Sequence, residues 1–290
     1  MEVNIMTNRT KGIIAIIIAS FGFAWMSIFV KLAGDLPVFQ KVFFRNIVSM
    51  FFALIMITIE KDRLIGKKQH QKLLLLRSVL GTTGMLLFFY SIDQLVAADA
   101  NMLNKLSSFF LILFSFLFLK EKITKYQLLA IIIAFLGSLF IIKPQFNIQI
   151  IPYLTSIAAA MFAGGAYTVL RALGTKEKYY TIVFYFSTFS VLVLTPFVIL
   201  QYQSMTTMQW IYLMLTGLGA TIGQFGTTIA YKFAPASEIS IFNYTNVVFV
   251  TVFAIPFLGE LPDYFSIAGY LIIFIASYFM FRHQNMPKST

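Results

Sequence analysis

The chain has 290 residues, of which 59% are hydrophobic and 11% are charged, and 33 of them are phenylalanine. A soluble domain carries about 25% charged residues, so this composition excludes an ordinary soluble protein and indicates a membrane protein. The net charge of +11 indicates membrane topology rather than nucleic-acid binding, because the Lys and Arg residues lie in short connections between apolar runs.

Ten apolar runs follow one another along the chain, each long enough to cross roughly 30 Å of hydrocarbon. They cover residues 12–30, 38–59, 73–91, 95–119, 126–142, 148–172, 180–200, 208–230, 235–258 and 264–281. We expect all ten to be helices, because lipid offers no partner for open backbone groups. The first run leads to Lys31 rather than to a cleavage site, so we expect a retained span. The connections are short, so residues 1–290 are expected to form a single transmembrane domain.

The second half of the chain repeats the first. Phe118-Leu119-Lys120-Glu121 ends the fourth run, and Phe257-Leu258-Gly259-Glu260 ends the ninth, 139 positions later. Further matches fall at or near this offset, including Asn104 with Asn243, Gly84 with Gly223 and Lys31 with Arg171. An internal repeat in so apolar a chain is typical of a transporter, with one repeat over residues 12–142 and the other over 148–282.

Loop charges predict the orientation of the spans. With the N-terminus in the cytoplasm, sixteen Lys and Arg residues fall inside and three outside, which fits the positive-inside rule. The inside set is Arg9, Lys11, Lys61, Arg63, Lys67, Lys68, Lys72, Lys120, Lys122, Lys125, Arg171, Lys176, Lys178, Lys232, Arg282 and Lys288, and the outside set is Lys31, Lys41 and Lys143. Both termini are therefore predicted to be cytoplasmic. Because each repeat has five spans, the two repeats must be inverted relative to each other.

Ten helices as two inverted five-helix repeats, with a Glu after each fourth helix, resemble the drug/metabolite transporter superfamily, EamA-like branch. Arg45 after Leu36-Pro37, and Tyr90 and Tyr231 before the fourth and ninth helices, add to the resemblance. It implies a basket of ten helices around a central cavity that opens alternately to each side. One departure lies in the fourth helix, where the family often has small residues or Pro and this chain has residues 104–108, Asn-Lys-Leu-Ser-Ser. The resemblance names no substrate.

Lys105 is the strongest candidate for a substrate contact. It lies near the middle of its span, where a charge costs roughly 2.5–3.5 kcal/mol, so we expect it to point into the bundle. Asn101, Asn104, Lys105 and Ser108 share one face of a helix, and the ninth span carries Ser240, Asn243 and Tyr244 in a similar pattern. Two interpretations stay open, a counter-charge for an acidic group of the substrate or a structural partner of Asp99 or of a neighbouring helix.

Other polar residues within the spans are secondary candidates. Arg45 either recognises a carboxylate or ties helix ends together, and Lys41 is expected to reach the headgroups. Gln224 lies among the glycines of the eighth span, which serve packing or hinge motion. Asp99 and Glu238 are repeat equivalents that either carry a coupling proton or are solvated helix starts. Glu121 and Glu260 end their helices, and we expect loop partners such as Lys122 or Lys125.

These observations predict a secondary active carrier of a small organic metabolite, such as an amino-acid-like zwitterion or an organic anion, in the cytoplasmic membrane. The alternative is a passive channel or a lipid scramblase. No nucleotide-binding motif occurs, so coupling would use an ion or proton gradient or exchange. An enzyme is not expected, since the chain has no Cys, and His70 and His283 lie in polar stretches. No cofactor or metal site is expected, and the oligomeric state is not predicted.

Overall fold

The computed structural model describes residues 7–143, 150–174, 176–233 and 240–284, and this part of the chain is helical with no strand. Nine of its segments are long and apolar enough to cross a membrane, and α9 adds another helix of 27 residues. The elements are α1 (Asn8–Leu32), α2 (Val38–Glu60), η1 (Lys68–His70), α3 (Gln71–Gln94), α4 (Ala97–Asn104), α5 (Ser107–Leu119), α6 (Lys125–Ile142), α7 (Ile151–Leu173), α8 (Tyr179–Leu200), α9 (Thr207–Phe233), η3 (Ser240–Tyr244), α11 (Thr245–Leu258) and α12 (Tyr264–Gln284).

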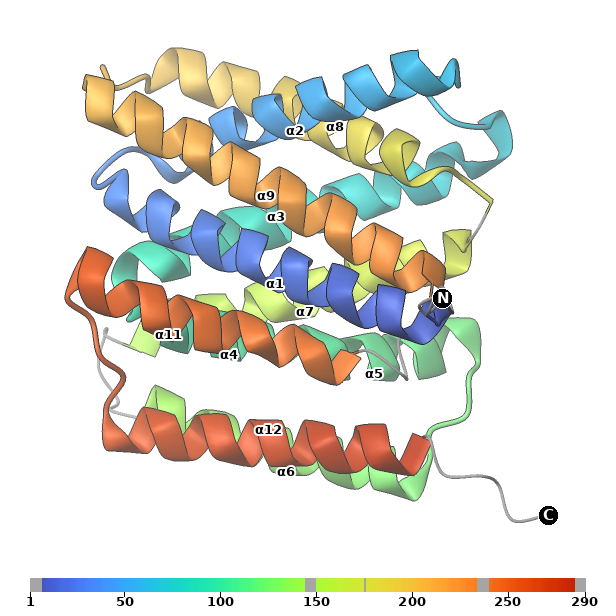
Figure 1. Ribbon diagram of the computed structural model, residues 1–290, viewed down its shortest axis with the longest axis vertical. Helices are drawn as coiled ribbons and strands as arrows, with labels where there is room; N and C mark the ends of the chain where they lie inside the picture. Colours follow the sequence, from blue (N-terminus) through green and yellow to red (C-terminus); the bar gives the residue numbers. More distant parts are fainter. Residues whose placement is uncertain (1–6, 144–149, 175, 234–239, 285–290) are drawn as a thin grey trace, which may run out of the picture.

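The helices lie side by side as one bundle, with α2 and α8 at one side and α6 and α12 at the other (Figure 1). The start of α1 and the end of α12 lie at the same end of the bundle (Figure 1). Since the helices alternate in direction, Lys31 in the last turn of α1 and Glu260 after α11 lie at the opposite end from Arg171 and Glu121. We refer to these as the Lys31 end and the Arg171 end.

Helix packing follows the repeat. The packing of α1 on α9 has its equivalent in α3 on α7, and the packing of α5 on α7 has its equivalent in α11 on α1. The pairs α2–α8 and α6–α12 each join equivalent helices, as a two-fold axis between the repeats requires. The fold is therefore an all-α membrane protein of ten spans in two inverted five-helix repeats, as the sequence predicts.

Small residues bring the central helices into backbone contact. A Cβ added to Gly219 of α9 would lie 2.7 Å from the carbonyl oxygen of Gly22 of α1 and 2.8 Å from the backbone nitrogen of Met26. A Cβ on Gly84 of α3 would lie 3.3 Å from the carbonyl oxygen of Ala159 of α7. Such contacts let dispersion forces hold helices together where lipid removes the hydrophobic driving force.

The repeated Phe-Leu-x-Glu motif builds the same helix ending twice. Lys120 and Gly259 both adopt left-handed backbone conformations, with φ of 56° and 65°. The following Glu121 N–H donates to the carbonyl of Ser115 at 3.2 Å, and the Glu260 N–H donates to the carbonyl of Ala254 at 3.3 Å. This closing turn stops α5 and α11 and fixes the direction in which each glutamate leaves its helix.

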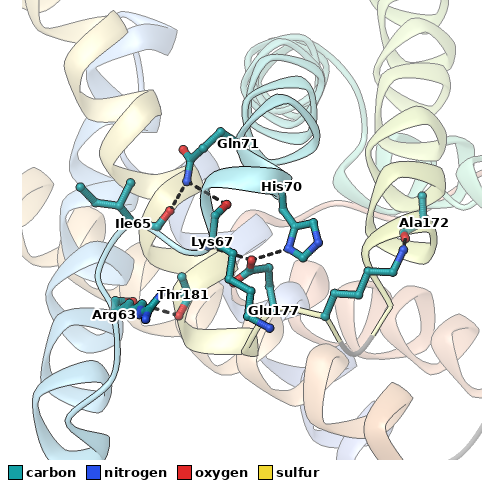
Figure 2. A network of polar contacts seen from close by, with 9 residues as sticks. Arg63, Ile65, Lys67, His70, Gln71, Ala172, Glu177 and Thr181 are labelled. Carbon is teal, nitrogen blue, oxygen red and sulfur yellow. Dashed lines mark hydrogen bonds and ion pairs between the residues drawn. The ribbon is translucent and has the colours of Figure 1, made fainter.

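Polar loops join the two repeats at the Arg171 end (Figure 2). Glu177, between α7 and α8, accepts from the Lys67 N–H at 2.9 Å and lies 2.6 Å from Nδ1 of His70. Nearby, the Tyr180 hydroxyl donates to Asp62 at 2.8 Å. This hydrogen bond and the Arg63 N–H hold the pKa of Asp62 below its usual range, with the backbone hydrogen bond the larger cause. His70 thus lies in a connecting loop, as predicted.

Candidate functional site

The fourth span is interrupted at its centre. Helix α4 ends at Asn104, and Lys105 and Leu106 form a tight turn before α5 begins. Its hydrogen bonds join residues three apart, with the Ser108 N–H donating to the Lys105 carbonyl at 3.1 Å and the Phe109 N–H donating to that of Leu106 at 2.9 Å. The ninth span has the short helix η3 at the equivalent place, ending at Tyr244. Interrupted helices of this kind form the substrate sites of many repeat transporters.

Lys105 lies at this interruption and is partly exposed within the bundle. Its ammonium group has no hydrogen-bond or ion-pair partner among the residues that the structure describes. The side chains of Asn104 and Ser108 beside it are also partly exposed and make no hydrogen bond within the described chain. The turn therefore collects one cation and two hydrogen-bonding side chains that are free to interact with a solute.

Neighbouring helices fix α4. Asn101 is buried, where it donates to the Ala97 carbonyl at 2.9 Å and accepts from the Ser27 hydroxyl of α1 at 3.2 Å. Ser156 of α7 donates to the Ala100 carbonyl at 3.2 Å. Asn101 is thus engaged in holding α4 to α1, while Asn104, Lys105 and Ser108 remain available.

The remaining predicted residues are spread over several helices. Tyr244 is buried and its hydroxyl hydrogen-bonds to Ser277 of α12, while Asn243 precedes it in η3. Gln224 is partly exposed on α9. Ser240 begins η3, and Glu238 lies outside the described residues.

Asp99 is bonded to another helix and not to Lys105. It is buried at the Lys31 end of α4 and accepts a hydrogen bond of 2.5 Å from the Tyr270 hydroxyl of α12. The carboxylate partner that sequence reasoning left open for Lys105 is therefore not Asp99. A buried carboxylate that is hydrogen-bonded to a neutral hydroxyl can bind and release a proton, as a coupling residue must.

An ion pair lies at each end of the bundle, and each pair joins the two repeats. Lys31 in the last turn of α1 pairs with Glu260, which also accepts from the Ala97 N–H at 2.8 Å. At the other end Arg171 of α7 pairs with Glu121 at 3.0 Å. Since Lys31 and Arg171 are repeat equivalents, as are Glu121 and Glu260, the two pairs are related by the pseudo-two-fold axis. The prediction that these glutamates pair with Lys122 or Lys125 is wrong, because the partners come from the opposite repeat.

The expectation for Lys41 is also wrong. Its side chain is fully buried rather than extended to the headgroups, and its ammonium group lies 2.7 and 2.8 Å from the two carboxylate oxygens of Asp93 of α3. Asp93 also lines a pocket of about 390 Å³ at the Lys31 end, together with Lys31, Asp35 and Tyr90. Charged residues therefore line the approach to the bundle from this end.

Sequence reasoning missed Arg77. It lies on α3 and is buried against Phe186 of α8, with its guanidinium carbon 3.9 Å from the ring centroid. Arg45 of α2 reaches the same ring at 5.8 Å, so it lies with Arg77 and not among the residues around Lys105. The sequence did offer a signal for Arg77, because it is a charged residue inside the apolar run 73–91 and was not counted among the loop charges.

Comparison with known proteins agrees with this architecture. The EamA-like transporter family matches residues 10–143 and again 150–282, once for each repeat. The chain belongs to the EamA-like transporter family. Family members of this kind belong to the drug/metabolite transporter superfamily, and they are transporters rather than enzymes.

Relatives of this EamA-like protein include several named transporters. The pseudopaline exporter CntI of Pseudomonas aeruginosa (strain UCBPP-PA14) is 32% identical, with 92% of this chain and 94% of the relative covered. Human solute carrier family 35 member G1 is 26% identical over 90% of this chain and 76% of its own. The riboflavin transporter of Brucella anthropi is 25% identical over 86% and 89%. A solved crystal structure shares the fold, with a TM-score of 0.64 at 13% identity, covering 93% of this chain and 99% of its own.

Proposed function

We propose that this EamA-like protein is a secondary active transporter that moves a small organic metabolite with an acidic group across the cytoplasmic membrane by alternating access. Lys105 carries the proposal. A cation at the centre of a span, at an interrupted helix and without a partner among the described residues, is costly unless a solute compensates it. Asn104 and Ser108 would orient the same group by hydrogen bonds.

The two symmetry-related ion pairs support an alternating mechanism. Each joins residues from both repeats, so a rocking motion of residues 12–142 against 148–282 would break one pair while it preserves the other. Both pairs are formed in this structure, one at each end of the bundle. Breaking the Lys31–Glu260 pair would free the Lys31 side chain, which also lines the pocket at that end.

The orientation and coupling follow from the charges. With both termini in the cytoplasm, the Lys31 end faces outward and the Arg171 end, rich in Lys and Arg, faces the cytoplasm. Asp99, buried beside Tyr270, is the candidate for a coupling proton. Glu238, its repeat equivalent, is the second candidate.

The test is counterflow in proteoliposomes with a panel of metabolites, including pseudopaline and riboflavin, the cargoes named for two relatives. We expect saturable exchange of an acidic or zwitterionic compound by the wild type. Lys105→Ala should abolish it, and Lys122→Ala, which removes an exposed loop lysine, should not. Equal elution of the three proteins in size-exclusion chromatography controls for folding.

Two results would contradict the proposal. Normal exchange by Lys105→Ala would exclude the counter-charge role. Flux that rises linearly with concentration, without counter-transport, would instead assign the chain to the passive conduits, a channel or a scramblase.

A further inference from the structure

Two buried arginines share one aromatic ring away from the Lys105 turn. Arg45 is 0% exposed and Arg77 is 7% exposed. Their guanidinium carbons lie 5.8 and 3.9 Å from the centroid of the Phe186 ring. Gly81 of α3 makes room for this arrangement, since an added Cβ would lie 3.0 Å from Cε2 of Phe186 and 3.2 Å from Nη1 of Arg77.

The chain supplies few acceptors to these guanidinium groups. Arg45 donates from Nη1 to Asn46 at 2.5 Å, but its Nε and Nη2 atoms, and Nη1 of Arg77, are buried without a hydrogen-bond partner. Neither arginine forms an ion pair with a carboxylate in the described part of the chain. Asp93, on the same helix as Arg77, pairs with Lys41 instead.

A purely structural role does not explain this cluster. Two like charges brought together without a carboxylate repel each other, and each buried N–H without an acceptor keeps its desolvation cost. Contact with one ring offsets part of that cost, because the face of an aromatic ring attracts a cation, but it supplies no oxygen acceptor. The missing compensation is what a carboxylate or phosphate provides, since it accepts several guanidinium N–H bonds at once.

We propose that Arg45 and Arg77 bind an acidic group of the cargo as a second anion subsite, in addition to Lys105. With three interior cations that lack carboxylate partners in the described chain, the cargo class is a small polyanion that carries carboxylate or phosphate groups. The proposal rests on the proposed function as a metabolite transporter.

The test uses the purified protein in detergent, with citrate as the carboxylate probe and inorganic phosphate as the phosphate probe, each exchanged for chloride at constant ionic strength. We expect citrate or phosphate to raise the Tm of the wild type, and whichever acts names the acidic group. Arg77→Gln should need at least about tenfold more of the same anion to reach the same rise in Tm, which corresponds to the loss of one guanidinium contact. Arg77→Lys should need an intermediate concentration, because lysine keeps the charge but lacks the planar guanidinium group that binds an anion by two hydrogen bonds.

The charge-matched control is Arg63→Gln, which removes an exposed loop guanidinium and should keep the wild-type response. A second readout separates binding from structure. Without an added anion, Arg77→Gln should melt at the same temperature as the wild type or higher, because a buried charge without a partner has been removed.

Three results would overturn the inference: no response of the wild type to either anion, an unchanged response of Arg77→Gln, or a lower Tm of Arg77→Gln without anion. None of these depends on transport. The proposed function fails separately, if Lys105→Ala exchanges metabolites normally.

Discussion

Replacing Glu260 by Gln should favour opening of the Lys31 end far more than Glu121→Gln favours opening of the Arg171 end. The substitution keeps the size and shape of the side chain but removes the charge that faces Lys31. It also weakens the hydrogen bond from the Ala97 N–H, which the carboxylate accepts at 2.8 Å. The two glutamates are repeat equivalents in identical helix endings, so each serves as the matched control for the other.

The expected magnitudes follow from exposure. The side chains of Lys31 and Glu260 are 17% and 19% exposed, whereas those of Arg171 and Glu121 are 52% and 39% exposed. Hydrogen bonds to charged groups away from water contribute about 1.5–3 kcal/mol, and exposed pairs contribute about 0–1 kcal/mol. Glu260→Gln should therefore shift the opening equilibrium by about tenfold or more, and Glu121→Gln by less than about fivefold.

Thiol accessibility measures these shifts directly. The chain contains no Cys, so Ser108→Cys places a single reporter beside the Lys105 turn without any background. In vesicles of known orientation, a membrane-impermeant maleimide is applied from one side at a time. We expect faster labelling of Glu260→Gln from the Lys31 side, and little change for Glu121→Gln from the Arg171 side. Equal increases for the two variants, or a larger one for Glu121→Gln, would refute the argument from exposure.

Three further outcomes are expected. Asp93→Asn leaves the fully buried Lys41 as a charge without its partner and should cost about 3 kcal/mol, seen as a lower Tm, while the double variant Lys41→Met, Asp93→Leu should recover most of it. Gly219→Ala should cost about 1–3 kcal/mol because its Cβ meets backbone atoms of α1, whereas Gly165→Ala, with a leucine methyl at 3.3 Å, should be neutral in thermal unfolding. Asp99→Asn should keep exchange but lose proton-driven accumulation in proteoliposomes, and full accumulation by this variant would exclude Asp99 as the proton carrier.

The spans could be predicted from sequence because lipid imposes a single length and a single kind of backbone structure on each of them. The inverted repeat was equally accessible, since Glu121 and Glu260 end their helices at a constant offset. The turn at Lys105 and Leu106 was not predicted, because the polar residues around it also fit one face of a continuous helix, and residue type reports nothing about hydrogen bonds three residues apart.

Partners distant in sequence could not be deduced. From sequence, Lys41 is interpreted as a lysine near the membrane surface, but in the structure α3 places Asp93 beside it. Likewise, Glu260 is interpreted as a loop residue, but α1 places Lys31 beside it. Arg77 lies in the second turn of α3, inside an apolar run, and was given neither a topological nor a functional role from sequence. Burial beside Phe186 depends on how α3 and α8 pack, which no local pattern in the sequence encodes.

The ion pairs between the two repeats affect which side of the membrane the protein opens to. If the two halves of the chain were identical, inversion would make the two ends of the bundle equal in energy, and the protein would rest equally often open to either side. Any preference must therefore come from positions where the halves have diverged. The ion pairs are such positions: Lys31 faces Glu260 in a sheltered setting, while Arg171 faces Glu121 in an open one. The preference for opening to one side of the membrane is thus set by the differences between the repeats. Substitutions at these four residues are the most direct way to reverse that preference.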